Sequence, residues 1–287
     1  MMNEIDFVVI GLRALVFIVV VQAAGGAIFL RLFGRSLSES GHLIRRFTLF
    51  AAVAGCVLVV SQHALEPARM TGTLAGVLDG SLQAILLASD AGTARATRVV
   101  GLVVIAISAF SKHRLRIQFG TIGAVITIGS FALMGHTATH PYRWILSVLL
   151  LVHLLVSAFW FGSLAGFWVT TAKEKIATNG IIVQHFSKIA SWLVPLILIA
   201  GVGMAIVLIP DFDALRSTYG LLILAKLLGF VGLLFLASWN KVRLGPAILH
   251  GSGAALATFR RIVGTEWFVI AAVLALTSVM TGLFSPD

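Results

Sequence analysis

The chain has 287 residues, of which 59% are hydrophobic and only 11% are charged, and its formal net charge is +10. Soluble globular proteins carry about 25% charged residues because water must wet their surface, so this composition excludes an ordinary soluble protein. A mean hydropathy of +1.03 indicates instead a surface that faces lipid. The sequence therefore predicts an all-α, polytopic membrane helix bundle, with residues 1–287 forming a single integral membrane domain.

We expect about eight transmembrane helices, because a helix needs roughly 20 apolar residues to cross the hydrocarbon core and such runs recur along the chain. Residues 70–90 are apolar but contain Asp79 and end at Asp90, which favours a short helix lying in the outer interface. If this segment spanned the bilayer, the parity of every later span would change. The predicted spans are residues 6–31, 45–65, 95–111, 117–136, 142–171, 184–209, 216–240 and 264–284.

The charges in the loops predict how these spans are oriented. Arginine and lysine are concentrated in alternate loops, and the positive-inside rule places those loops in the cytoplasm. Both termini are then expected outside. The basic excess reports membrane topology in this interpretation, so nucleic-acid binding is not expected. The basic residues are Arg31, Arg35, Arg45 and Arg46 after the first span, Lys112, Arg114 and Arg116 after the third, Lys173 and Lys175 after the fifth, and Lys241, Arg243, Arg260 and Arg261 after the seventh.

Candidate metal ligands gather at the outer end of the fourth span, in Met134-Gly-His136-Thr-Ala-Thr-His140. Ionisable groups at membrane depth are costly, so each of them is a functional candidate. Pro141 biases His140 away from the helical conformation, and we therefore expect His136 and His140 to flank a tight outer turn. His63, at the outer end of the second span, lies at a compatible depth.

A further histidine, His153, is expected near the middle of the membrane, about 18 Å along the fifth span from Pro141. Trp160 follows it on the same helix face. Imidazole suits copper, zinc, iron and nickel, whereas thioether sulfur favours Cu(I). The only cysteine is Cys56, so histidine and methionine without paired thiols favour copper over zinc. The alternative is packing, because methionine fills cores and a lone histidine often serves as a hydrogen-bonding helix contact.

Charged and polar groups in the later spans need partners of their own. Lys226 falls near the middle of the seventh span, where an ammonium must face a cavity or a carboxylate. Glu266, expected near the inner end of the eighth span, and Asp79 are the candidate carboxylates. Asn240 lies below Lys226 on a similar face. Arg13 and Glu266 have the alternative of extending to the membrane interfaces.

Several short motifs follow one another in a specific order. They are Gly135-His136, His153 with Trp160-Phe-Gly162-Ser-Leu, Tyr219-Gly220 with Lys226, Ala237-Ser-Trp-Asn240, and Arg260-Arg261 with Glu266. Their order and spacing, over roughly residues 120–284, resemble the copper resistance D (CopD) family of bacterial inner-membrane proteins. The first third of the chain is similar only in hydropathy. Ser163 stands where the family has a second glycine, a change that affects packing.

The resemblance implies a multi-pass protein of the bacterial inner membrane, with periplasmic termini, that takes up copper or transfers it to the cytoplasm. A periplasmic copper-binding protein is the implied partner. The family's histidines correspond to His136 and His153, its acid to Glu266 and its lysine to Lys226.

The sequence contains no nucleotide-binding or aspartyl-phosphate motif, so we expect a copper-permeation protein and not an enzyme. Copper is expected to be captured from the outer side, passed to His153, and moved past Trp160 toward the inner polar residues. Two alternatives stay open: a membrane cytochrome that holds haem b between His63, His136 and His153, or a copper-binding docking protein without transport. The candidate metal ligands are His63, Met134, His136, His140 and His153, and the candidate path residues are Trp160, Lys226, Asn240 and Glu266.

Overall fold

The computed structural model describes residues 4–111, 113, 115–135, 140–208 and 218–283, and throughout these residues the regular elements are helices. In this part of the chain, eight helical segments are long and apolar enough to cross a membrane, which confirms an all-α polytopic membrane bundle. The long helices are α1 (Glu4–Phe33), α2 (Gly41–Thr71), α4 (Asp90–Phe110), α5 (Arg116–Gly129), α7 (Arg143–Lys173), α8 (Ile176–Leu208), α9 (Thr218–Trp239) and α11 (Gly253–Leu283).

Shorter elements connect or extend them. These are the 3-10 turns η1 (Gly34–Ser36), η2 (Leu74–Leu78) and η3 (Ser130–Leu133), the short helices α3 (Gly80–Ala88) and α10 (Gly245–Leu249), and the π-helical turn η5 (Asn240–Leu244). The fourth span consists of α5 continued by η3.

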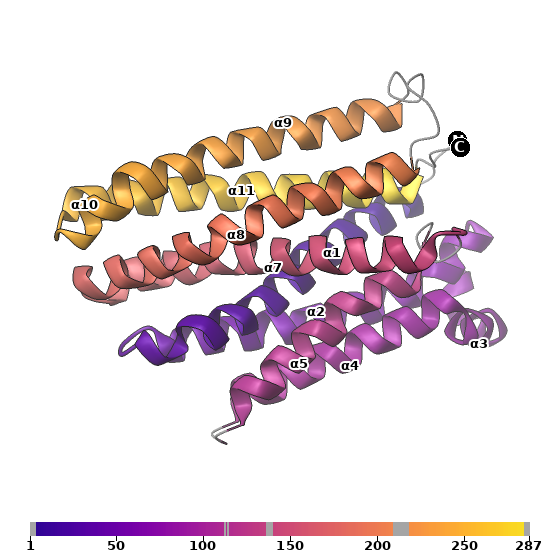
Figure 1. Ribbon diagram of the computed structural model, residues 1–287. Coiled ribbons are helices and arrows are strands. Elements are labelled where there is room, and N and C mark those ends of the chain that lie inside the picture. The colour runs from indigo at the N-terminus through magenta and orange to yellow at the C-terminus, as the bar shows by residue number, and fades with distance from the viewer. Residues whose placement is uncertain (1–3, 112, 114, 136–139, 209–217, 284–287) are drawn as a thin grey trace.

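Helix α1 lies at the centre of the bundle. It packs against α2, α4, α5, α7 and α11, and every residue from Val20 to Ala27 is buried. The middle of α1 consists of the small residues Ala23-Ala-Gly-Gly-Ala27, which let neighbouring helices approach it closely on several sides. Figure 1 shows α8, α9 and α11 along one side of the bundle and α2, α4 and α5 along the other.

The backbones of α1 and α7 touch where Gly25 meets Gly162. A Cβ atom on Gly25 would collide with the carbonyl oxygen of Ala158, and a Cβ atom on Gly162 would collide with the backbone of Gly25. Small residues allow this approach between membrane helices, where packing replaces the hydrophobic effect as the driving force. The crossing holds α7, which carries His153 and Trp160, against the central helix.

The segment between α2 and α4 contains no spanning helix. At about 14 Å, the nine-residue α3 is too short to cross the hydrocarbon core, as predicted for residues 70–90. Asp79 caps it by accepting hydrogen bonds from the backbone N–H groups of Ser81 and Leu82. These bonds, together with one from the Ser81 hydroxyl, lower the pKa of the Asp79 carboxyl.

The first residues of α1 and the last of α11 lie at the end of the bundle where α3 is found (Figure 1). Side chains confirm this neighbourhood, because Arg13 donates hydrogen bonds to the carbonyl and hydroxyl oxygens of Thr281. An even number of spans requires such an arrangement. The assignment of this end to the periplasm stays a prediction from loop charge.

The last helix begins earlier than predicted, at Gly253 instead of residue 264. The hydroxyl of Ser252 accepts a hydrogen bond from the N–H of Ala255 and so helps to cap its start. Arg260 and Arg261 therefore lie inside α11 and not in a loop. Glu266 consequently lies about 20 Å along the helix, near its middle, and its depth in the membrane stays a prediction.

Candidate functional site

Glu266 is the most deeply buried carboxyl group in the described residues, with a relative exposure of 2%. Its Oε1 accepts a hydrogen bond of 2.7 Å from Nδ2 of Asn240, and its Oε2 accepts one of 3.3 Å from Nε1 of Trp160. A buried carboxyl group is costly unless it is hydrogen-bonded, and here both oxygens are. We call Trp160, Asn240 and Glu266 the Glu266 centre; it joins α7, the end of α9 and α11.

Asn240 is the first residue of η5, the π-helical turn that extends α9. The N–H of Gly245 bonds the carbonyl of Asn240, five residues back, and Pro246 then has no N–H to restore the α-helical ladder. Single π turns inside α-helices are frequent at functional sites. The side-chain Oδ1 of Asn240 is buried and has no hydrogen-bond partner among the described residues, so this acceptor remains available.

A cavity of about 270 Å³ adjoins the Glu266 centre, and all three of its residues line the wall. Lys241 and Ser191 lie at its exposed side, where Nζ of Lys241 donates a hydrogen bond of 2.7 Å to the Ser191 hydroxyl. Most of its wall is apolar, with Ser191, Asn240, Lys241 and Glu266 among the polar residues. A cavity of this volume has room for several water molecules, each of which takes about 30 Å³, and polar partners for them lie beside the buried carboxyl group.

The next residue, Trp267, ties the same stretch of α11 to α1. Its Nε1 donates a hydrogen bond of 3.0 Å to Oε1 of Gln22, and its ring stacks on Phe161 at 5.2 Å. Sequence reasoning missed Trp267, although Gln22 is a polar residue within the apolar first span. The pair fixes the position of α11 beside Glu266.

His153 is held in one orientation by α8. Its Nδ1 lies 3.2 Å from the carbonyl oxygen of Ile197, and its ring rests against Gly201. A carbonyl oxygen only accepts hydrogen bonds, so Nδ1 carries a proton, and in the neutral ring Nε2 keeps its lone pair. Histidines that bind metals typically donate their other ring N–H in this way.

Lys226 of α9 lies close enough to His153 to interact with it electrostatically. Neither of the carboxylates proposed as its partner forms an ion pair with it: Asp79 caps α3, and Glu266 is bonded within its own centre. Lys226 thus adds positive charge beside His153.

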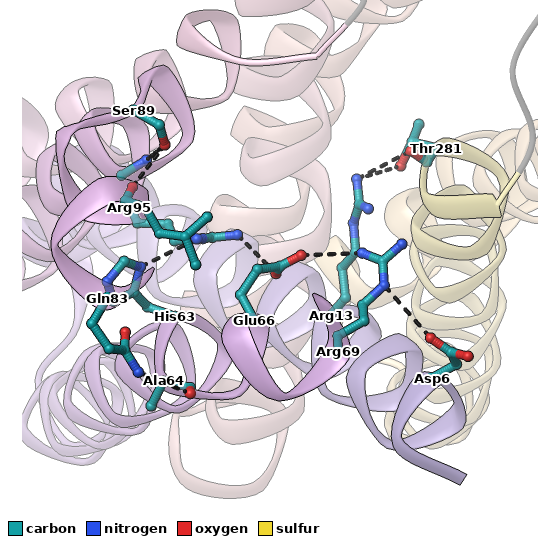
Figure 2. A network of polar contacts seen from close by, with 12 residues as sticks. Asp6, Arg13, His63, Ala64, Glu66, Arg69, Gln83, Ser89, Arg95 and Thr281 are labelled. Carbon is teal, nitrogen blue, oxygen red and sulfur yellow. Dashed lines mark hydrogen bonds and ion pairs between the residues drawn. The ribbon is translucent and has the colours of Figure 1, made fainter. Parts of the chain in front are cut away.

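His63 has a partner that the sequence did not reveal. Nη1 of Arg95 lies 3.2 Å from Nδ1 of His63, and Nη2 of Arg95 lies 3.0 Å from Oε2 of Glu66 (Figure 2). An arginine only donates, so Nδ1 accepts and the proton of the neutral ring is on Nε2. In this tautomer neither ring nitrogen offers a free lone pair, and copper binding by His63 would require the contact with Arg95 to be given up.

The same network continues to the first helix. Arg69 of α2 bonds Glu66 at 3.1 Å and lies 3.6 Å from the carboxylate of Asp6 (Figure 2).

One turn beyond Arg95, the buried Arg98 donates a hydrogen bond of 3.0 Å to Ser130 and covers the ring of Phe131 at 3.8 Å. Arg98 thereby fixes η3, the turn that leads into Met134.

In the predicted turn from Met134 to His140, the structure describes only Met134, Gly135 and His140. Gly135 has a φ of +83°, a conformation that favours glycine, and it follows Met134 directly. His140 accepts a hydrogen bond of 3.1 Å at Nδ1 from the N–H of Tyr142. His136 lies outside the described residues. Within the residues that are described, no group of three or more His, Cys, Asp or Glu side chains is arranged to hold a metal ion.

The structure thus brings three predicted residues, Trp160, Asn240 and Glu266, into direct contact, and places His153 on the same helix as Trp160. It gives His63 a different set of neighbours. The predicted roles of Met134, His136 and His140 stay predictions.

Two family models match the chain. The model described as Copper resistance protein D matches residues 180–280, and the one described as Copper resistance protein D-like, N-terminal domain, matches residues 2–142. The second match extends the likeness into the first third of the sequence, where only hydropathy had suggested it. Neither a curated protein nor a solved structure matches the chain.

Proposed function

The chain belongs to the copper resistance protein D family, and on that basis we propose that it transports copper ions across the bacterial inner membrane. Copper is the substrate in this proposal, and no chemical reaction is catalysed. The ion enters from the periplasm, where a copper-binding protein delivers it, and moves through the bundle toward the cytoplasm.

The observation that carries the proposal is the alignment of His153 with the Glu266 centre. His153 and Trp160 are seven residues apart on α7, so they share a helix face and lie about 10 Å apart along the axis. The free Nε2 of His153 supplies a nitrogen ligand. Further along α7, at Trp160, the oxygens of Glu266 and Asn240 supply a second step. They lie beside the cavity that the exposed residues Lys241 and Ser191 border.

These two steps have the chemistry that conduction requires. A single imidazole, followed by a carboxylate and an amide oxygen, binds copper less firmly than a closed set of thiolates, so the ion can leave as well as enter. Lys226, close to His153, repels a cation and keeps its residence there short. Capture at the outer end is assigned to His136 and His140.

His63 and Met134 complete the proposed capture group. His63 joins it only after Arg95 has turned away, since Arg95 occupies Nδ1 in this structure. Capture is therefore coupled to a rearrangement of the Glu66 network.

The test is copper flux into proteoliposomes, read by a Cu(I) indicator inside the vesicles. We expect His153→Gln and Glu266→Gln to lower the flux by about tenfold or more, as loss of metal-site groups generally does. His250→Gln, which alters an exposed histidine, is the control and should leave the flux unchanged.

Unchanged flux in both path variants would show that the route is wrong. Copper binding without flux in the unaltered protein would favour the docking alternative. A Soret band in the purified protein would favour the alternative of a haem b protein. No contact among the described residues supports that alternative.

A further inference from the structure

A second cavity, of about 350 Å³, lies between α1, α2, α4 and α5 at the end of the bundle opposite α3. This end carries the arginine-rich loops that loop charge assigns to the cytoplasm. The polar residues of its wall are Arg35, Ser38, His42, Arg45, Thr48, Ser108 and Arg116. We call it the arginine cavity.

The charge in the arginine cavity is unbalanced. Its fifteen lining residues, all in the described part of the chain, include three arginines and no carboxylate. Arg45 and Arg116 are half-buried and close enough to repel each other electrostatically. Neither guanidinium group has a hydrogen-bond or ion-pair partner among the described residues. Two partly desolvated like charges destabilise a fold unless an anion neutralises them.

Glu174, a carboxylate nearby in the fold, is fully engaged elsewhere. It accepts four hydrogen bonds from the loop before α2: from the hydroxyl of Ser38, the N–H of Glu39, and the N–H and hydroxyl of Ser40. Glu174 is not part of the cavity wall. Its bonds instead fix the loop that forms one side of the cavity, which keeps Arg35 and Arg45 in place without balancing their charge.

We propose that the arginine cavity binds a phosphate group. Guanidinium groups pair with phosphate through two parallel N–H···O bonds, and Arg45 and Arg116 supply such forks from two different helices. The volume accommodates a phosphate with its nearest waters. Basic pockets between helices at the cytoplasmic surface are the type of site that holds lipid head groups. A free phosphate has the same chemistry, so the test separates the two sources.

This site shares no residue with the Glu266 centre, so it does not depend on copper transport. The proposal also explains why the arginines line one cavity. The positive-inside rule accounts for basic residues at this end of the bundle, but it does not require them to lie together.

Thermal unfolding of the full-length protein in detergent tests the proposal. The chain is measured with phosphatidylcholine alone, with added phosphatidylglycerol, and with phosphatidylcholine and inorganic phosphate. We expect phosphatidylglycerol to raise the Tm by about 5 °C. The R45Q/R116Q double variant should lose this rise, and R46Q, which changes the exposed arginine next to Arg45, should keep it.

A rise with inorganic phosphate that also disappears in R45Q/R116Q supports the site and assigns it to a free phosphate. No rise with either anion, or an equal loss in R46Q, overturns the proposal. If the double variant does not fold, R35Q replaces it, because Arg35 is exposed and its loss removes a cavity charge without removing packing. A count of bound phosphatidylglycerol by native mass spectrometry must then fall in R35Q, and an unchanged count overturns the proposal as well.

Discussion

Asn240 and Glu266 are joined by a hydrogen bond of 2.7 Å, which links the π-helical turn after α9 to the middle of α11. The bond places an amide and a carboxyl group, 26 residues apart in the sequence, at the wall of one cavity. Because both groups are buried, each depends on the other for part of its hydrogen bonding.

Asn240→Ala should therefore destabilise the protein and impair transport together. The change leaves Oε1 of Glu266 without its donor, and an unsatisfied buried acceptor costs about 1–3 kcal/mol. We expect a lower Tm and reduced copper flux in proteoliposomes. Ser238→Ala, at an exposed residue of α9 that lines the same cavity, is the control and should change neither. Equal effects in the two variants would contradict the role given to Asn240.

The sequence predicted the number of spans because apolar runs and loop charges are local signals. It misplaced the start of α11 because the charged pair Arg260-Arg261 was counted as part of a loop, whereas both residues lie inside the helix. The contacts of Glu266 with Trp160 and Asn240 join three helices, and one sequence contains no signal for such long-range pairs.

His63 illustrates a different limit. The third span was predicted to begin at residue 95, and no role was predicted for Arg95. In the structure α4 begins at Asp90, which carries Arg95 into the bundle with only 7% exposure, opposite His63. A five-residue error in a helix boundary thus hid the partner of a candidate ligand.

The contact between α1 and α7 at Gly25 and Gly162 should not tolerate a side chain in place of either glycine. Gly162→Ala would force a Cβ atom into the backbone of Gly25, and overpacking of this kind costs roughly 3 kcal/mol when only backbone can move. We expect a large fall in Tm, measured in detergent. Gly129→Ala is the matched control, because the space around Gly129 is open and its backbone is helical. A similar Tm for both variants would show that the crossing is looser than described.

The carboxyl group of Glu66 should be essential to the end of the bundle that contains α3. It holds Arg95, whose side chain is 8% exposed, and Glu66→Gln would leave that guanidinium without a counter-charge. Breaking a buried pair on one side costs about 3–5 kcal/mol, so Glu66→Gln should lower the Tm strongly. Glu4→Gln, at the exposed start of α1, should have little effect. A double-mutant cycle with Arg95→Gln measures the coupling, and a coupling near zero would contradict the network.

The bonds to Glu174 predict how stability depends on pH. Burial alone would raise the pKa of the Glu174 carboxyl, but the hydrogen bonds from Ser40, Glu39 and Ser38 outweigh it and hold the pKa at about 2, below the ordinary 4.5. A carboxyl whose pKa is lowered by folding stabilises the folded state above the unfolded pKa. That contribution is lost as the pH falls from about 4.5 to about 2.

Glu174→Gln removes the charge that these bonds favour, so it should be less stable than the unaltered protein at pH 7, by roughly 2 kcal/mol. The difference should shrink as the pH is lowered through that window, because the unaltered chain loses its contribution and the variant has none to lose. Thermal unfolding between pH 7 and pH 2.5 measures both curves. Glu39→Gln changes an exposed carboxyl on the same loop and should follow the unaltered protein at every pH. Parallel curves for the unaltered protein and Glu174→Gln would mean that the Ser38–Ser40 loop is held by something other than this charge.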